Sequence, residues 1–125
     1  MASQESKSEL NAYAAACPTR MILDRIADKW TVLVIGRLVR SPMRFNALRR
    51  EIEGLSQKVL SQKLKELERD GLVNRKAFAT VPVTVEYSIT PLGATLARVV
   101  GALTAWAENN ADSILAARKH YDQRP

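Results

Sequence analysis

The sequence of 125 residues contains one cysteine and one histidine, and both scarcities limit what the protein can do. A single cysteine excludes a disulfide within the chain. The histidine, His120, lies in a polar C-terminal tail, and the sequence shows no Ser/His/Asp set, metal-ligand spacing or glycine-rich phosphate loop. We therefore expect neither an enzyme nor a protein with a bound metal or cofactor.

Long apolar runs are also missing. No uninterrupted apolar stretch approaches the ~18–20 residues that a membrane-spanning helix needs. The first ten residues, MASQESKSEL, lack the basic start and apolar segment of a signal peptide. We therefore expect a chain that acts in the reducing cytoplasm, away from membranes. A length of 125 residues, with 46% apolar and 26% charged residues, fits one ordinary globular domain.

Acidic residues are scarce in one central segment. Between Lys29 and Lys65 the chain has nine lysines and arginines but only Glu51 and Glu53 as acids, a balance of +7. Because the whole chain carries +6, the remainder sums to −1. A charged run can be simply a solvated face, but surplus positive charge gathered in one segment favours a surface that binds nucleic acid.

The same segment carries a helix-turn-helix pattern. Residues 44–52 (RFNALRREI) predict a short amphipathic helix and residues 53–55 a tight turn. Residues 56–70 (SQKVLSQKLKELERD) predict a second helix with Ser56 as its N-cap. Residues 72–89 show the alternation of a β-ribbon, which would form the wing. In this layout the second helix enters the major groove of DNA.

Apolar and polar residues separate on the predicted second helix at 100° per residue. The apolar side holds Val59, Leu60, Leu64 and Leu67. A plain amphipathic helix would look similar, but the opposite side has no acid before the helix end, whereas ordinary exposed helices mix both signs. Amide, ammonium and hydroxyl groups near the helix start suit base edges. The predicted base contacts are Gln57, Lys58, Ser61 and Gln62.

Basic residues around that face are suited to phosphate contacts, which set register and salt sensitivity without carrying sequence information. The predicted phosphate contacts are Arg44, Arg49, Arg50, Lys65, Arg69, Arg75 and Lys76. The wing tip, residues 80–84, is uncharged. We therefore expect the wing to contribute little to DNA binding.

The segments before the motif are less distinctive. Residues 1–8 are expected to be frayed, and residues 9–16 to form a short alanine-rich helix that ends at the Cys-Pro pair. Thr19 is the expected N-cap of the next helix. Residues 29–40 are apolar nearly all round and fit a buried strand or a buried helix. Their length and the following Ser41–Pro42 favour a helix at the centre of the core.

A long final helix is predicted from Pro91, capped by Thr90, to about Arg118. Its apolar residues recur at spacings of four and three, as in a coiled-coil seam. They are Leu92, Leu96, Val99, Leu103 and Trp106. This stripe packs either on its own domain or on a second copy. A helix of about 28 residues would extend beyond so small a domain, so we expect a homodimer with Leu96, Val99, Leu103 and Trp106 in its interface.

These motifs, taken in order, resemble the HxlR family of bacterial winged-helix transcription factors. The matching pieces are CP near the start, DKWT, RFNALRR, GLSQKVLSQKLKELERDGLV and VEYSITPLG, which span roughly residues 17–106. The resemblance implies a mainly α fold with a small β-hairpin, a winged helix-turn-helix flanked by N- and C-terminal dimerisation helices. It also implies a homodimer on palindromic double-stranded promoter DNA, more commonly as a repressor.

The expected organisation follows from this resemblance and the patterns above. Residues 1–16 form an N-terminal arm or helix. Residues 17–115 form the DNA-binding domain, including the dimerisation helix, and residues 116–125 form a C-terminal tail. The alternative functions are a constitutive regulator and a winged-helix module that binds protein or RNA.

Cys17 has two interpretations. A lone cysteine is usually a small buried hydrophobe, but a place just ahead of a helix start and close to Arg20 favours a thiolate. The resemblance implies that several members carry a sensing cysteine here and respond to quinones, aldehydes, hypochlorite or disulfide stress. With no second cysteine, oxidants or other electrophiles would give a Cys17–Cys17′ disulfide between subunits, a mixed disulfide, a sulfenic acid or an adduct.

Overall fold

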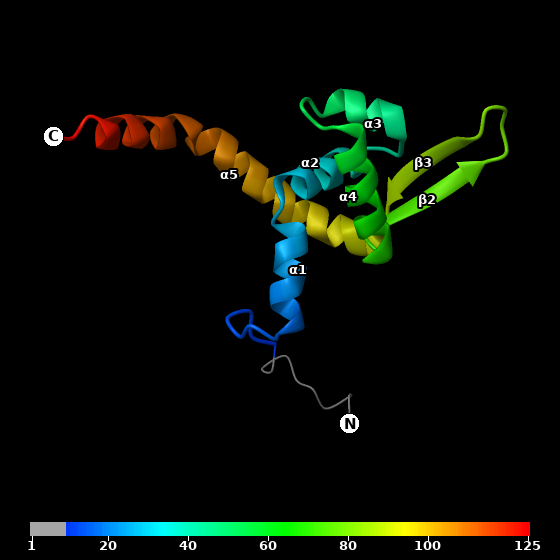
Figure 1. Cartoon of the computed structure of the whole chain (residues 1–125), viewed down its shortest axis with the longest axis horizontal. Coiled ribbons are helices and arrows are strands. Elements are labelled where there is room, and N and C mark those ends of the chain that lie inside the picture. Colours follow the sequence, from blue (N-terminus) through cyan, green and yellow to red (C-terminus); the bar gives the residue numbers. More distant parts are fainter. Residues whose placement is uncertain (1–9) are drawn as a thin grey trace.

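The computed structural model describes residues 10–125, and the prediction for residues 1–8 lies outside them. The elements follow the order α1 (Pro18–Ile26), α2 (Lys29–Leu38), β1 (Met43–Arg44), α3 (Phe45–Glu51), α4 (Gln57–Arg69), β2 (Val73–Phe78), β3 (Thr84–Ile89) and α5 (Pro91–Asp122). The five helices and the small sheet of these described residues confirm the predicted mainly α fold with a winged helix-turn-helix (Figure 1).

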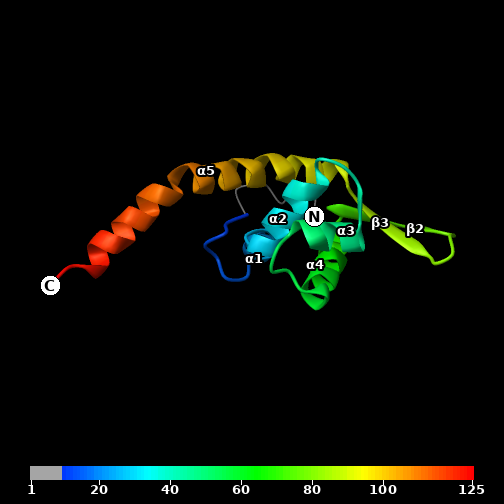
Figure 2. The same cartoon turned by 90° about the horizontal axis from the view of Figure 1, so that it is seen from above.

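The centre of the core is α2, which confirms the helical interpretation of residues 29–40. Asp28 caps this helix, since its carboxylate accepts a hydrogen bond of 3.1 Å from the Thr31 amide. Leucines of α3 and α4 pack with it, and α5 covers it along the other side (Figure 2). The core residues of these helices are Val34, Ile35, Leu38, Leu48, Leu60, Leu64, Leu67, Ala97 and Val100. This packing leaves the wing extending to one side.

The sheet has three antiparallel strands in the order β1-β3-β2. The hairpin of β2 and β3 is the predicted ribbon. The short strand β1 was not predicted: it pairs Met43 with Tyr87 and Arg44 with Glu86. Two residues are too few for an alternating pattern. β1 ties the start of α3 to the wing.

The N-terminal prediction was wrong. Residues 10–16 form successive turns instead of a helix, because the Asn11 side chain accepts a hydrogen bond from the Tyr13 amide at 3.0 Å and competes with helical bonding. α1 begins at Pro18, with Cys17 as N-cap, so Thr19 lies inside the first turn and is not the cap. A proline suits this first position because it has no amide hydrogen to satisfy.

The start of α5 is as predicted. The Thr90 hydroxyl accepts from the Gly93 amide at 2.9 Å, and Pro91 occupies the first turn. The helix ends at Asp122, a few residues beyond the predicted end. Its buried residues are all in its first third (Gly93, Ala97 and Val100). The C-terminal part of α5, after the residues that face α2, extends away from the body of the protein (Figure 1).

Candidate nucleic-acid interface

Helix α4 is fixed at its start and along its apolar face. The Ser56 hydroxyl accepts a hydrogen bond of 3.1 Å from the Val59 amide, which confirms the predicted N-cap. Leu60, Leu64 and Leu67 are buried and Val59 is half-buried, as the helical projection predicted. The polar face of α4 is therefore directed away from the core.

The predicted DNA-contacting residues share that outward face. Gln57, Lys58, Gln62, Lys65 and Arg69 are exposed, and Ser61 is half-buried. Within residues 10–125, none of the three cations on this face forms an ion pair. Their charge is therefore available to an external anion, and the first-turn residues stand at the end of α4 whose dipole favours negative charge.

Two cations from the positive central segment are already paired inside the protein. Arg37 of α2 makes a bidentate contact with Glu51 at the end of α3, at 2.6 and 3.0 Å. This hydrogen bonding lowers the pKa of Glu51. Lys63 of α4 contacts Asp28 at 3.3 Å and has a side chain only 21% exposed. The balance of +7 already subtracts Glu51 but not Asp28, so the pairing of Lys63 lowers the positive charge of this segment that faces solvent.

The predicted phosphate contacts on and beside α3 are exposed. Arg44 is the N-cap residue of α3, and Arg49 and Arg50 lie in its last turn. Arg44 and Arg50 line one hollow of about 480 Å³ between α3 and the wing, which includes Pro82. Arg49 and Arg50 line a second hollow of about 380 Å³ against the turn before α4. The guanidinium groups of α3 therefore line one hollow beside the wing and another beside the turn that leads into α4.

The wing separates the two cations that were predicted together. In the register of β2 and β3, Arg75 pairs with Tyr87 and Lys76 with Glu86. Successive residues of a strand point to opposite faces, so Arg75 and Lys76 lie on opposite faces of the ribbon. The tip is uncharged, and at its centre Val81 is fully exposed. Only one of these two cations can therefore face a DNA backbone on a given side of the wing.

Helix α5 carries two apolar stripes, offset by one residue. The smaller residues Gly93, Ala97 and Val100 face the protein's own core. In the larger stripe Leu96 is half-buried, but Val99 is 63%, Leu103 55% and Trp106 58% exposed. This favours the second of the two interpretations of the stripe, because most of it is uncovered in the single chain.

Cys17 is the N-cap residue of α1 and is partly exposed, so it is not a buried hydrophobe. A hydrogen bond with the Thr19 side chain is the main cause that lowers the pKa of its thiol. Desolvation raises this pKa, but the Thr19 side chain and weaker backbone hydrogen bonds with Thr19, Asn11 and Arg20 together outweigh that effect. The N-cap position therefore promotes the thiolate, which is the reactive form.

The arrangement matches a known class of regulators. The model of the HxlR-like helix-turn-helix family matches residues 25–114. The chain belongs to this family. The HTH-type transcriptional regulator YtfH of Escherichia coli (strain K12) is 45% identical over 116 residues, which cover 93% of this chain and 91% of the relative. The HxlR-type prediction made from the sequence motifs is confirmed.

Solved structures of other regulators share the fold. The transcriptional regulator ytfH from Salmonella typhimurium has a TM-score of 0.83 at 42% identity, covering 87% of this chain and 97% of that one. The redox regulator HypR in its reduced form has a TM-score of 0.72 at 36% identity, covering 79% and 98%. The protein is accordingly a DNA-binding transcriptional regulator. Within residues 10–125, none of its helices is both long and apolar enough to cross a membrane.

Proposed function

We propose that this HxlR-type regulator binds a palindromic operator in double-stranded DNA as a homodimer and acts, in the cytoplasm, as a repressor. The observation that carries the proposal is the outward face of α4, where Lys58, Lys65 and Arg69 are exposed and unpaired among the described residues. Gln57, Lys58, Ser61 and Gln62 contact base edges in the major groove. This assignment follows from their place near the start of α4.

Phosphate contacts surround this base-contacting face. Arg44, Arg49 and Arg50 bind the backbone from α3, and Lys65 and Arg69 bind it farther along α4. Arg75 or Lys76 adds one contact from the wing. Each neutralised phosphate releases counterions, so binding weakens steeply as the salt concentration rises.

A homodimer accounts for the exposed stripe on α5. Val99, Leu103 and Trp106 become buried when two copies pack through this helix, and Leu96 extends the same stripe toward the body. Two-fold symmetry then presents two α4 helices to the half-sites of a palindrome. Repression is the commoner mode of action that the family resemblance implies.

Selection of duplexes from a random library tests this proposal, because it requires no known operator sequence. We expect the wild-type protein to enrich a palindrome and to bind it more tightly than a scrambled duplex of equal length. The preference persists at salt concentrations that abolish binding to the scrambled duplex. A library that stays random after repeated selection would contradict sequence-specific binding.

The second part of the proposal is that Cys17 makes DNA binding responsive to oxidants, quinones or other electrophiles. Its support is the partly exposed thiol at the start of α1, whose pKa is lowered by the Thr19 hydroxyl. Modification of Cys17 alters α1 and, through it, the spacing of the two α4 helices. Diamide or a quinone should release the selected duplex from the wild type but not from Cys17→Ala. Equal binding by treated and untreated wild type identifies a constitutive regulator with a structural cysteine.

A further inference from the structure

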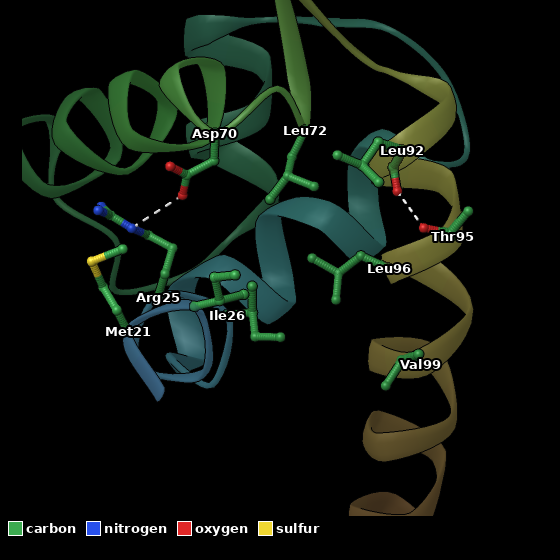
Figure 3. Close-up of a pocket in the computed structure, with 10 residues that line it drawn as sticks. Met21, Arg25, Ile26, Asp70, Leu72, Leu92, Thr95, Leu96 and Val99 are labelled. Carbon is green, nitrogen blue, oxygen red and sulfur yellow. Dashed lines mark hydrogen bonds and ion pairs between the residues drawn. The ribbon is translucent and has the colours of Figure 1, made fainter. Parts of the chain in front are cut away.

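A run of alternating charges joins α1 and the start of α2 to the recognition helix α4. Its ion pairs are Asp28–Lys63 at 3.3 Å, Lys63–Glu66 at 3.8 Å, Glu66–Arg25 at 2.7 Å and Arg25–Asp70 at 3.2 Å. We call these five residues the α1–α4 charge cluster. Figure 3 shows Arg25 reaching from α1 toward Asp70.

The charge cluster occupies a separate face of α4. Lys63, Glu66 and Asp70 follow one another at spacings of three and four residues, so they share one side of the helix. That side is neither the buried leucine face nor the outward face that carries Lys58 and Lys65. Helix α4 is thus held by apolar packing on one face and by charges on a second. The outward face touches the cluster at one point, where the Gln62 amide donates a hydrogen bond of 3.4 Å to Glu66.

The ion pairs of this cluster join α1 directly to α4. No residue of α1 is fully buried, although Ile26 packs against the core. A mostly apolar groove of about 670 Å³ separates α1 from the start of α5 (Figure 3). Arg25, in the last turn of α1, contacts carboxylates at two successive turns of α4. One guanidinium therefore links the two helices.

We infer that Arg25 is a positioning residue for DNA recognition: by holding Glu66 and Asp70 it fixes the tilt and rotation of α4. This role rests on the DNA-binding function proposed above. The cluster contains two cations and three carboxylates, so it does not itself attract phosphate. Base contacts require side chains held to within about 0.5 Å. A helix fixed on two faces keeps that placement better than a helix fixed on one.

The sign of an electrostatic change tests this inference. The double variant Glu66→Gln/Asp70→Asn removes two negative charges beside the DNA surface, which by charge alone should tighten binding to every duplex. The positioning role predicts instead a roughly three- to tenfold loss of affinity for the duplex selected by the wild type. Affinity for a scrambled duplex should stay constant or rise. The matched control is Glu68→Gln, because Glu68 is an exposed acid of α4 with no ion pair among the described residues. This variant should not weaken binding to the selected or to the scrambled duplex.

The ion pairs between α1 and α4 can also be removed by a substitution in α1. Arg25→Gln and Arg20→Gln remove the same charge from the same helix, but Arg20 has no ion pair within residues 10–125. Only Arg25→Gln should lower the ratio of selected to scrambled affinity, and Arg25→Lys should restore part of it. Thermal melting followed by circular dichroism shows which variants are folded. If Glu66→Gln/Asp70→Asn does not fold, the Arg25 variants test the positioning role on their own.

The outcomes distinguish failure of the positioning role of Arg25 from failure of the proposed DNA-binding function. Tighter binding of Glu66→Gln/Asp70→Asn to both duplexes, together with an unchanged ratio in Arg25→Gln, would overturn the positioning role and leave DNA recognition intact. A wild-type protein that selects no duplex would overturn the proposed function itself.

Discussion

The exposed tryptophan of α5 gives the most quantitative prediction about assembly. Trp106 is 58% exposed in the single chain. Tryptophan buries up to 150–250 Å², so packing against a second copy would remove roughly 90–150 Å² more from water. At about 25 cal/mol per Å² this contributes about 2–4 kcal/mol for each subunit. Because two-fold symmetry uses the side chain twice, the dimer loses about 4–8 kcal/mol, so Trp106→Ala should raise the dimer dissociation constant by roughly three to six orders of magnitude.

Leu115 provides the matched control for this experiment. It is 59% exposed on the same helix, and nine residues at 100° each place it on the opposite side from Trp106. Sedimentation equilibrium at several protein concentrations should show weakened dimerisation for Trp106→Ala and a near wild-type constant for Leu115→Ala. Circular dichroism should show both variants folded. An unchanged constant for Trp106→Ala, or equal weakening by both variants, would refute the assignment of this stripe as the interface.

Three further predictions concern the wing junction, the thiol and acid stability. Gly93→Ala places a β-carbon against the Leu72 carbonyl oxygen, so urea unfolding should show a loss of about 1–3 kcal/mol; an unchanged midpoint would contradict this close approach. Thr19→Val removes the hydrogen bond that most lowers the pKa of Cys17, so the pH midpoint of alkylation by iodoacetamide should rise, and a midpoint that stays or falls would be inconsistent with it. The pKa of Asp28 is lowered: partial burial raises it, but the Thr31 amide and Lys63 together outweigh that effect. Its stabilisation is complete above the unfolded-state value of about 4 and is lost as the pH falls below it. Unfolding free energies of wild type and Asp28→Asn should therefore converge on acidification, and a constant difference down to pH 2 would argue against this contribution.

Local signals explain why the helix-turn-helix was predictable. Ser56 and Thr90 cap their helices through hydrogen bonds to amides three residues away. The apolar face of α4 follows from a spacing that depends only on the residues of that helix. Such features depend on neighbours in the sequence, so the sequence contains what is needed to find them.

Contacts between distant residues account for what the sequence could not show. Arg37 is paired with Glu51, fourteen residues away, and Lys63 with Asp28. A charge count along the chain treats all four as independent. The charge cluster that includes Arg25 was missed for the same reason, since Arg25 and the two carboxylates that it contacts lie on different helices.

The two stripes of α5 show a subtler limit. Large apolar residues usually face the core, yet here smaller ones do. The reason is the close approach of α5 to the backbone at Leu72, where a side chain on Gly93 would not fit. Only the three-dimensional packing decides which of two adjacent stripes is buried. Val99, Leu103 and Trp106 of the larger stripe therefore stay exposed in the single chain.

The most direct test of the central claim compares Lys58→Ala with Arg50→Ala on the selected and the scrambled duplex. As a base contact, Lys58 should contribute about 1–3 kcal/mol to the selected duplex and little to the scrambled one, so its loss relaxes sequence preference. As a phosphate contact, Arg50 should weaken both alike and reduce the salt dependence by about one unit of slope. Equal losses on both duplexes from Lys58→Ala would contradict the claim that the outward face of α4 contacts the bases.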